Sequence, residues 1–464
     1  MRTYDLGKNK SYAIYSAVRG DILGGVLKKG ERLPSKRVLA ADAGVSVITV
    51  QTAYDQRPAE GYIPSKERSG FFAAAAAVRP LGERPPAPCE LLAGDAPQEY
   101  EIDLVAGSTP AELFPFSVWT KLMRKVLAEE GSHLLQRVPA PGDIALRSEI
   151  AGYLYRARGV NCPPERIIVG AGAEYFYGML VNILGRDKLF AVEDPGHGKI
   201  ASTYALGGAR CAFIPVHRNG VDLKAVESSN ADVLHISPSH QFPTGAVTPA
   251  ACRVRLINWA RERGAYIVED DYDSEFRLSG MPLQSMLGLD PERVIYINTF
   301  SKSLAPSMRM GYMILPESLA VKYYEMFSTS ANVVPLFEQK TLAAMIGEGH
   351  FERHINRLKN YYRNVRQEVL AAIASVPYKT TAFDTGAGMH IALQCPQALS
   401  DESIKQTAAA MGIRIKCLTD YLRSSVPGYE KIAVVNYSGL KKGQAAAIAD
   451  KFAKLGINLF RGGA

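Results

Sequence analysis

The sequence has no uninterrupted apolar run of the roughly eighteen residues that a membrane-spanning helix needs. The nearest stretch, residues 167–185, contains Glu174 and Asn182 and is better explained as a strand, a turn and a helix. The six cysteines are scattered without a CxxC pair, which argues against a disulfide framework and a zinc site. The charged N-terminus is not followed by the apolar segment of a secretory signal. These absences predict a cytoplasmic protein with no membrane partner and no bound metal.

What the sequence contains is typical of a globular protein with more than one domain. Apolar residues make up 47% and charged residues 22% of the 464 residues, which predicts two or three units around at least one large core. Residues 1–88 hold 6 Lys and 8 Arg against 4 Asp and 4 Glu, so this segment carries +6 of the formal net charge of +8. Such a local basic excess suits a nucleic-acid partner and an ordinary solvated surface equally well.

An alanine- and proline-rich stretch divides the chain. Residues 73–100 contain a run of five alanines and five prolines, a composition that packs poorly and that proline stiffens into an extended spacer. We therefore expect an N-terminal domain over residues 1–73, a linker over residues 74–100 and a large domain over residues 101–464.

The N-terminal segment has the spacing of a helix-turn-helix followed by a wing. Apolar positions from Tyr12 to Leu23 recur at helical spacing, and a second helix is predicted over residues 35–43. A turn at Gly44 leads into a third helix, for which Ser46 is the expected N-cap. The segment EGYIPSKERSGFFA then has two short apolar runs around a charged, glycine-containing tip. Three amphipathic helices could also form a mere interaction module, but the basic balance and the wing favour a mostly α winged helix-turn-helix that binds DNA.

Residues 11–73 resemble the GntR family of transcription regulators. The matching motifs are ERLPS, LA, GVS, TV, AY, EGY and the glycine-tipped wing, at residues 31–35, 39–40, 44–46, 49–50, 53–54, 60–62 and 70. The resemblance implies DNA-facing positions at Lys36, Arg37, Thr49, Gln51, Ser69 and Gly70. Lysine and arginine suit phosphates, and glutamine can make a bidentate contact to adenine. Family members often carry arginine in the recognition helix, where this chain has Val47 and Gln51, and Pro58 falls where a helix usually continues toward the wing.

The large domain alternates apolar, β-rich runs with helix-length segments. The runs are RIIVGAG, KLFAVED, CAFIPV, VLHIS, AYIVEDD and RVIYINTFS. This alternation predicts an α/β domain with a doubly wound, mostly parallel sheet. Ligands of such sheets bind beyond the carboxyl ends of the strands, so the residues that follow each run are the candidates for chemistry.

Three of these strand ends carry reactive or ligand-binding groups. Gly170–Ala173 lies between a strand and a helix, where free backbone N–H groups favour a phosphate. Glu269–Tyr272 brings several carboxylates and a phenol to the rim of the sheet. Thr299–Tyr312 leads from a strand into Lys302, with Arg309 seven residues further on. Each motif alone would also suit a tight turn, a solvated acidic loop or a surface lysine.

Together the three motifs resemble the fold-type I aminotransferases, which bind pyridoxal 5'-phosphate (PLP). The resemblance implies that Lys302 forms the Schiff base with PLP and that Asp270, in preference to Asp271, pairs with the pyridinium nitrogen. An imine needs an amine that can lose its proton, and a carboxylate keeps the ring nitrogen charged. The remaining contacts implied by the resemblance are a hydroxyl from Tyr272, phosphate contacts from Gly172, Ala173, Thr299, Ser301 and Arg309, and ring stacking by His197.

Two positions depart from the aminotransferase pattern. The family often has an arginine for the substrate carboxylate near the C-terminus, where AVVNYSGL has Val434. The segment around residues 136–138 lacks the tyrosine that such enzymes lend to the neighbouring subunit's phosphate. Both departures lower the expectation of amino-acid transamination, and they leave room for an effector without a carboxylate or for PLP itself.

A GntR-like winged helix joined by a proline-rich linker to an aminotransferase-like domain resembles the MocR subfamily of bacterial regulators, from about residue 11 to the C-terminus. The resemblance implies a homodimer through the large domain and a DNA operator as partner. It also implies a transcription regulator that retains PLP for sensing, with a small-molecule amine or amino acid, or PLP itself, as the effector. The alternative is a catalytically active PLP-dependent aminotransferase, because Lys302, Asp270 and Tyr272 are the parts that such an enzyme needs.

Overall fold

The computed structural model describes residues 9–55, 62–63, 65–66, 70–74, 100–105, 107, 109–280, 283–375, 380–396, 399–424, 427–441, 443–444, 447–448, 450–451 and 454. The chain forms two compact units, Met1–Gln98 and Glu99–Ala464. Their buried apolar clusters share no residue, so each unit has its own core. The domain boundaries expected at residues 73 and 100 stay predictions, because residues 75–99 lie outside the described part of the chain.

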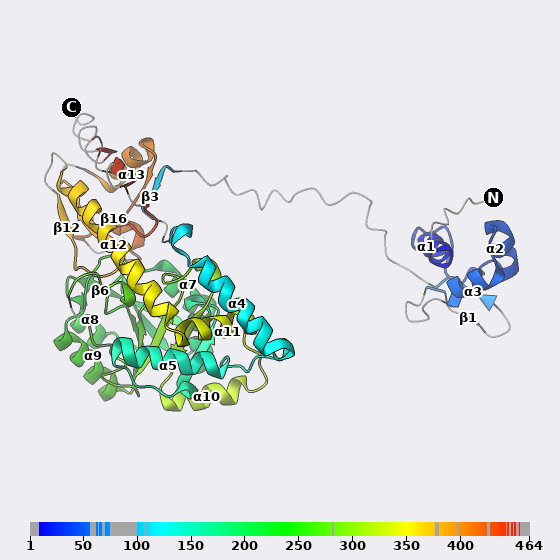
Figure 1. Ribbon diagram of the computed structural model, residues 1–464, viewed down its shortest axis with the longest axis horizontal. Helices are drawn as coiled ribbons and strands as arrows, with labels where there is room; N and C mark the ends of the chain where they lie inside the picture. Colours follow the sequence, from blue (N-terminus) through cyan, green and yellow to red (C-terminus); the bar gives the residue numbers. More distant parts are fainter. Residues whose placement is uncertain are drawn as a thin grey trace. The chain divides into compact units, whose positions relative to one another are not determined.

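The small unit consists of three helices and a two-stranded hairpin (Figure 1). The elements are α1 (Lys10–Leu23), α2 (Lys36–Ala43), α3 (Val47–Asp55), β1 (Ser65–Lys66) and β2 (Gly70–Phe71), with β1 and β2 antiparallel. The predicted N-cap Ser46 is present, since its Oγ accepts from Thr49 N at 3.1 Å. Ser35, which was predicted to begin the second helix, is the N-cap of α2, with its Oγ accepting from Val38 N at 3.3 Å. The predicted turn at Gly44 is left-handed and separates α2 from α3. The winged helix-turn-helix is thus confirmed.

One apolar cluster holds the three helices and the wing together. Ile14 of α1 and Val50 of α3 are fully buried in it. Tyr54 ties the last turn of α3 to the wing, because its ring lies 4.8 Å from that of Phe71 and its hydroxyl donates to Pro34 O at 3.0 Å. The position of α3 relative to the wing therefore follows from side chains that face inward at helical spacing.

The large unit is built on an eight-stranded sheet with the order β4-β11-β10-β9-β8-β5-β6-β7. The strands are β4 (Ile167–Gly170), β5 (Leu189–Asp194), β6 (Arg210–His217), β7 (Gly220–Val221), β8 (Val233–Ile236), β9 (Tyr266–Asp270), β10 (Val294–Thr299) and β11 (Gly311–Ile314). Neighbours from β10 to β6 are parallel, whereas β11 and β7 run antiparallel to their neighbours. The predicted mostly parallel sheet is confirmed, and the carboxyl ends of β4, β5, β8, β9 and β10 meet at one edge.

Helices cover both faces of this sheet, as expected for strands that are buried on both sides (Figure 1). They are α4 (Phe116–Glu130), α5 (Ile144–Arg158), α6 (Ala173–Leu184), α7 (Gly198–Leu206), α8 (Leu223–Ser228), α9 (Ala250–Arg263), α10 (Glu317–Phe327) and α11 (Leu336–Gly347). Short 3-10 turns lie in the connections between these helices and strands. They are η3 (Ala111–Leu113), η4 (Gly131–Leu135), η5 (Pro164–Arg166), η6 (Ser274–Phe276) and η7 (Pro306–Met308).

A C-terminal lobe, which the sequence did not predict as a separate layer, completes the large unit. It contains an antiparallel sheet of the order β12-β13-β16-β15 and a parallel pair, β14-β3. Its elements are β3 (Ile102–Asp103), β12 (Thr381–Phe383), β13 (His390–Gln394), α13 (Asp401–Ala410), β14 (Ile413–Arg414), β15 (Lys416–Cys417), η8 (Leu418–Tyr421) and β16 (Ile432–Asn436). The long helix α12 (His350–Ala374) runs between this lobe and the large sheet (Figure 1).

No helix within the described ranges is long and apolar enough to cross a membrane.

The separate cores predict separate unfolding of the two units. Replacing the fully buried Ile14 by alanine should remove about 2–5 kcal/mol from the small unit, which is a large fraction of a small domain's stability. Both tryptophans, Trp119 and Trp259, lie in the large unit, so the fluorescence melting curve of Ile14→Ala should match that of the wild type. Circular dichroism should show a helical transition at lower temperature, and Val26→Ala at an exposed position serves as the control. A fluorescence transition lowered in step with the helical one would contradict independent units.

Candidate functional site

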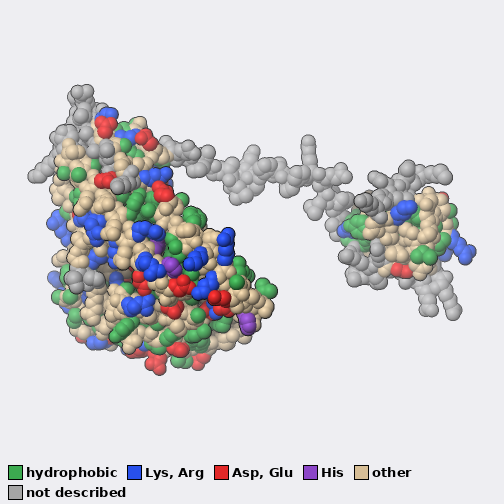
Figure 2. Space-filling model, in the orientation of Figure 1, with side chains coloured by type: hydrophobic (Ala, Val, Ile, Leu, Met, Phe, Trp, Pro, Cys, Tyr) green, Lys and Arg blue, Asp and Glu red, His purple; other side chains and the backbone are tan. Residues whose placement is uncertain are grey.

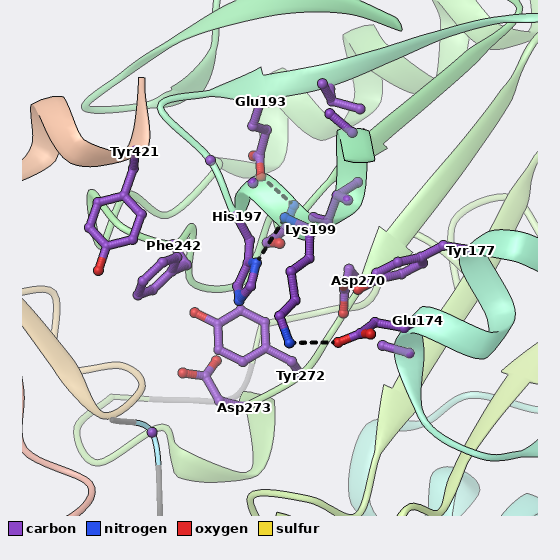
Figure 3. Close-up of a pocket in the computed structure, with 18 of the residues that line it drawn as sticks. Glu174, Tyr177, Glu193, His197, Lys199, Phe242, Asp270, Tyr272, Asp273 and Tyr421 are labelled. Atoms are coloured by element: carbon purple, nitrogen blue, oxygen red, sulfur yellow. Dashed lines mark hydrogen bonds and ion pairs between the residues drawn. The ribbon is translucent and has the colours of Figure 1, made fainter. Parts of the chain in front are cut away.

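A cavity of about 280 Å³ lies at the edge where the carboxyl ends of the parallel strands meet. Its wall includes the ends of β5, β9 and β10, the starts of α6 and α7, and residues of the C-terminal lobe (Figure 3). Six of the side chains predicted from the sequence line this one cavity, namely Ala173, His197, Asp270, Tyr272, Thr299 and Lys302. Distant segments of the chain thus meet where a doubly wound sheet binds its ligands.

Lys302 follows β10 and points into the cavity. Its Nζ donates to the backbone oxygen of Gly107 at 2.7 Å. A β-carbon on Gly107 would lie 2.2 Å from Nζ, so a residue without a side chain is required at this close approach. Burial lowers the pKa of Lys302 because the surroundings penalise the charged ammonium. An amine with a lowered pKa is a better nucleophile near neutral pH.

Asp270 presents one carboxylate oxygen to a network and leaves the other without a partner. The hydroxyl of Tyr177 donates to Asp270 Oδ2 at 2.5 Å, and His235 Nε2 lies 3.4 Å from the same oxygen. His235 Nδ1 in turn lies 2.7 Å from the hydroxyl of Tyr204. Asp270 Oδ1 is buried and has no hydrogen-bond partner among the described atoms. A buried acceptor of this kind costs free energy unless a donor reaches it, and a ligand N–H group would supply one.

Asp271, the alternative carboxylate, is engaged elsewhere. Its Oδ2 lies 2.9 Å from Arg158 Nη2 and accepts from the hydroxyl of Tyr296 at 2.6 Å. Both members of the ion pair are almost inaccessible to solvent, with side chains 10% and 0% exposed, and Asp271 is not among the residues of the cavity wall. The two neighbouring aspartates therefore have separate environments, one at the cavity and one in the core.

The turn between β4 and α6 has the geometry of a phosphate cradle. Gly172 precedes α6 with φ at +90°, which favours glycine, and no side chain caps the free N–H groups of the first turn. Arg309 donates from Nη2 to Ala171 O at 3.1 Å, and the same nitrogen lies 3.1 Å from the position of a β-carbon on Gly172. The helix N-terminus and the guanidinium are thus neighbours. Gly172, Ser301 and Arg309 are not themselves among the residues of the cavity wall, whereas Ala173 is.

Tyr272 adjoins a buried cluster of His240, Asp273 and His390. The hydroxyl of Tyr272 donates to His240 O at 3.0 Å, and His240 Nδ1 lies 2.8 Å from Asp273 Oδ2. The rings of His240 and His390 are 4.2 Å apart with a tilt of 40°. Three possible metal ligands lie together here. The two rings are tilted, and His240 Nδ1 faces Asp273 Oδ2, so the members of the cluster contact one another directly.

His197 and Lys199 form the outer wall at the start of α7. His197 is the N-cap, with Nδ1 accepting from Lys199 N at 3.4 Å, and its ring lies 5.7 Å from that of Phe242. The side chain of Lys199 extends across the cavity to pair with Glu174 at 2.8 Å (Figure 3). The sequence analysis did not identify Lys199, Tyr177 or His235. Tyr177 lies one helical turn after Ala173, so a helix starting at the cradle was a usable signal for it.

The predicted DNA-facing residues are only partly free for such a role. Arg37 and Gln51 are exposed, whereas the Lys36 ammonium lies 5.0 Å from the centre of the Phe71 ring. Thr49 Oγ1 lies 2.8 Å from Ser46 Oγ at the start of α3. Gly70 belongs to β2 of the wing, and Ser69 lies outside the described residues.

The exposed side of α3 also carries apolar side chains that the sequence analysis did not select as contacts. Ile48 is 77% exposed and Val47 is 43% exposed. Figure 2 shows hydrophobic and basic side chains next to one another on the described surface of this unit, with little acidic surface in the same view. Exposed apolar groups on a recognition helix are suited to the methyl group of thymine.

Comparison with protein families assigns both units. Residues 10–73 match the model of bacterial regulatory proteins of the gntR family, and residues 101–433 match that of aminotransferase class I and II. The fold and the cavity thus define a protein that joins a GntR-type winged helix to an aminotransferase-like domain.

Relatives with the same two units extend over most of the chain. The HTH-type transcriptional regulator YdeL of Bacillus subtilis is 35% identical over 404 residues, 87% of each chain, and the probable rhizopine catabolism regulatory protein MocR of Rhizobium meliloti is 33% identical over 92% of this chain and 90% of its own. The chain belongs to the MocR subfamily of GntR-type transcription regulators. Among solved structures, α-aminoadipate aminotransferase LysN of Thermus thermophilus, complexed with N-(5'-phosphopyridoxyl)-L-leucine, matches with a TM-score of 0.68 and 25% identity over 78% of this chain and 93% of its own.

The two aspartates should respond differently to the same substitution. Asp271→Asn leaves the buried Arg158 without a counter-charge, so the large unit should lose about 3–5 kcal/mol of unfolding free energy. Asp270→Asn keeps an acceptor for Tyr177 and removes a buried charge, so stability should be unchanged or higher. Urea unfolding followed by tryptophan fluorescence, without added cofactor, measures both. If Asp270→Asn and Asp271→Asn lose the same unfolding free energy, the two aspartates do not have different environments.

Proposed function

We propose that this regulator holds PLP on Lys302 and that an amine effector, by replacing Lys302 on the cofactor, changes the affinity of the winged helix for operator DNA. The observation that carries the proposal is the cavity itself. It brings a lysine of lowered pKa and a buried carboxylate with an unpartnered oxygen to one enclosed space beside an uncapped helix start. When bound, PLP supplies an electrophilic carbon that forms a reversible covalent bond with amines.

The side chains present fit this cofactor. Asp270 Oδ1 would accept from the ring nitrogen, which answers the need of that buried oxygen for a donor. The N–H groups of the first turn of α6, which begins at Ala173, and the guanidinium of Arg309 beside Gly172 would hold the phosphate. Thr299 lines the same cavity and would add a hydroxyl.

Tyr177 and His235 would act through Asp270. Burial and the charge of Asp270 raise the pKa of Tyr177 well above its ordinary value, so its hydroxyl remains a donor at neutral pH. Donation to Oδ2 stabilises the carboxylate in its charged form, which is the form that favours a protonated ring nitrogen. The hydroxyl of Tyr272, which donates to His240 O in this structure, would be the donor for the phenolic oxygen of the cofactor.

Sensing requires that the cavity have two states with different DNA affinities. An amine that takes the place of Lys302 leaves the lysine free, so the contacts of Lys302 differ between the two states. An effector shifts an equilibrium only by the difference in its affinity for the two states, and the coupling to DNA is reciprocal. PLP itself would be the effector if its loading, and not its exchange with an amine, altered DNA binding.

We further propose a homodimer formed through the large unit. Its support is the aminotransferase-like fold, together with large exposed hydrophobic side chains such as Phe116 on α4 and Leu135 on η4. A symmetric dimer would present two winged helices to the two halves of a palindromic operator.

A catalytically active aminotransferase is the second candidate. It has the support of the match to aminotransferase class I and II, but relatives that share both units are named as regulators. The chain also departs from the aminotransferase pattern at Val434, where the resemblance expects an arginine for the substrate carboxylate. Sensing therefore has more support than turnover.

Lys302 should be the amine that carries the cofactor. Wild-type protein mixed with PLP should develop a visible absorbance band that borohydride traps on the peptide containing Lys302. Lys302→Ala should show no trapped band and keep its basal DNA binding. Lys199→Ala is the informative comparison, because Lys199 is the other lysine in the cavity wall but is exposed and paired with Glu174. If borohydride traps PLP on the Lys302→Ala variant but not on the Lys199→Ala variant, Lys302 is not the lysine that carries the cofactor.

The small unit should bind DNA through phosphate contacts by Arg37. Arg37→Gln should weaken binding to all duplexes, both random and selected in vitro, and reduce the slope of log affinity against log salt by about 1. Fluorescence anisotropy at several salt concentrations measures both quantities. Arg210→Gln, an exposed arginine of the large unit, is the matched control. If the DNA affinity is the same for wild type and Arg37→Gln and does not change with salt, Arg37 makes no phosphate contact.

Ile48 should contribute to sequence preference and not to general affinity. Because an apolar side chain can pack on a thymine methyl but cannot pair with a phosphate, Ile48→Ala should lower affinity for a selected duplex and leave random duplexes unchanged. The salt slope should match that of the wild type. An equal loss on both kinds of duplex would mean that Ile48 supports the fold of α3 and does not read bases.

A further inference from the structure

The position at which the aminotransferase resemblance expects a carboxylate-binding arginine cannot bind an anion in this chain. Val434 of β16 is 2% exposed and packs in an apolar cluster with Ala392, Leu418 and Ile432. It is not among the residues that line the cavity. An effector with an anionic group therefore needs a counter-charge from another part of the wall.

The turn after η8 supplies such a group, Arg423, and a buried carboxylate holds this turn in place. Arg423 N donates to Asp194 Oδ1 at 2.8 Å, and Ser424 N donates to Asp194 Oδ2 at 2.9 Å. The hydroxyl of Ser424 donates to the same Oδ2. Asp194 ends β5 and is 1% exposed. The backbone of Arg423 is thus anchored to the large sheet at the cavity wall.

Arg423 is a cation of this wall whose side chain has no hydrogen-bond or ion-pair partner among the described residues. Lys302 donates to Gly107 O, and Lys199 pairs with Glu174. The guanidinium of Arg423 makes no hydrogen bond or ion pair with any described residue, although it lines the cavity. Both oxygens of the nearby Asp194 are occupied by donors of the turn itself. A guanidinium offers parallel N–H donors that match the two oxygens of an anionic group.

A second positive group lies beside this guanidinium. Arg423 Nη2 is 2.8 Å from the position that a β-carbon on Gly198 would take, and Gly198 is the first residue of α7. The aligned peptide dipoles of α7 place partial positive charge at this end. Burial raises the pKa of Glu193, another residue of the cavity wall, to about 8. The guanidinium of Arg423 and the start of α7 therefore lie side by side at one corner of the cavity.

We propose that Arg423 binds the anionic group of the effector, so that the effector is a primary amine that also carries a carboxylate, sulfonate or phosphonate. The inference rests on the proposed function, since it concerns the amine that exchanges with Lys302. The absence of arginine at position 434 left room for an effector without a carboxylate, whereas this inference assigns the counter-charge to a different turn. Arg423 is a specificity residue at this site, and the amine chemistry remains with Lys302.

The test uses amines matched for chain length with and without the anionic group. The full-length protein loaded with PLP is titrated with 4-aminobutanoate, 3-aminopropanesulfonate, 3-aminopropylphosphonate and n-propylamine, which each carry the amine on a chain of three saturated carbons, and the shift of the visible band and the heat of binding are both recorded. Wild type should respond to at least one of the three anionic amines at concentrations about tenfold or more below those needed for n-propylamine. Arg423→Gln should lose this preference and keep the response to n-propylamine. Arg423→Lys should retain part of it, because the charge remains but the paired donors are lost.

Controls separate this inference from the proposed function. Arg210→Gln should behave as wild type, and the fluorescence melting curve of Arg423→Gln should be unchanged because the exposed side chain has no partner to lose. If n-propylamine shifts the band but wild type shows no preference for an anionic amine, or if Arg423→Gln keeps the preference, Arg423 has no such role and the proposed function stands. If neither PLP nor any amine produces a spectral change, the proposed function fails and this inference fails with it. Which of the three anionic amines responds identifies the anionic group.

Discussion

The cavity of the large unit depends on one buried carboxylate that is only half satisfied. Asp270 ends a strand that is buried on both faces, receives a hydrogen bond from Tyr177 on one oxygen and offers the other to the cavity. Such a group is stable only if it is neutral, or if a donor or a positive charge completes its surroundings. A protonated ring nitrogen stabilises this carboxylate better than water does, because it supplies both a hydrogen-bond donor and a positive charge. The neighbouring Asp271 shows the contrasting solution, in which the protein supplies its own cation, Arg158.

The sequence was sufficient to predict the groups that act by their place in a local motif. Ser46 could be identified as a cap because a cap is defined by the residues next to it, and Lys302 could be identified because it follows a strand within a recognisable motif. His235 could not be found in this way. It contacts Asp270 because β8 lies beside β9, and the order of strands in a sheet is a property of the whole fold that no short stretch contains. Arg423 was missed for the same reason, since it reaches the cavity from a lobe that packs back on the sheet more than one hundred residues after Lys302.

Val434 illustrates how a correct observation about sequence can support too broad an interpretation. The absence of arginine there is real, and the buried apolar cluster around Val434 explains why this strand position carries no charge. The step from a lost arginine to an effector without an anionic group assumes that only one position can supply the charge. Several helices, strands and turns line a cavity, and an arginine on any of them can place its guanidinium beside the ligand. The charge of a site is therefore better predicted from all the residues that line it than from one sequence motif.

The wall of the cavity also indicates how a ligand can have an effect beyond its own contacts. Asp270 belongs to the large sheet, whereas Tyr421, Arg423 and Asn436 come from the C-terminal lobe. An effector amine that is attached to PLP beside Asp270 and paired with Arg423 at its other end would join the two. The attachment between them at this point is made by Asp194, through hydrogen bonds to the turn that carries Arg423. A ligand that spans two bodies favours the arrangement in which it can touch both, and it shifts the population by the free energy of the added contact. An amine without an anionic group can release Lys302 but makes no charged contact with the lobe. On this argument the covalent exchange selects amines as a class, and the contact with Arg423 decides which of them changes the arrangement of the protein.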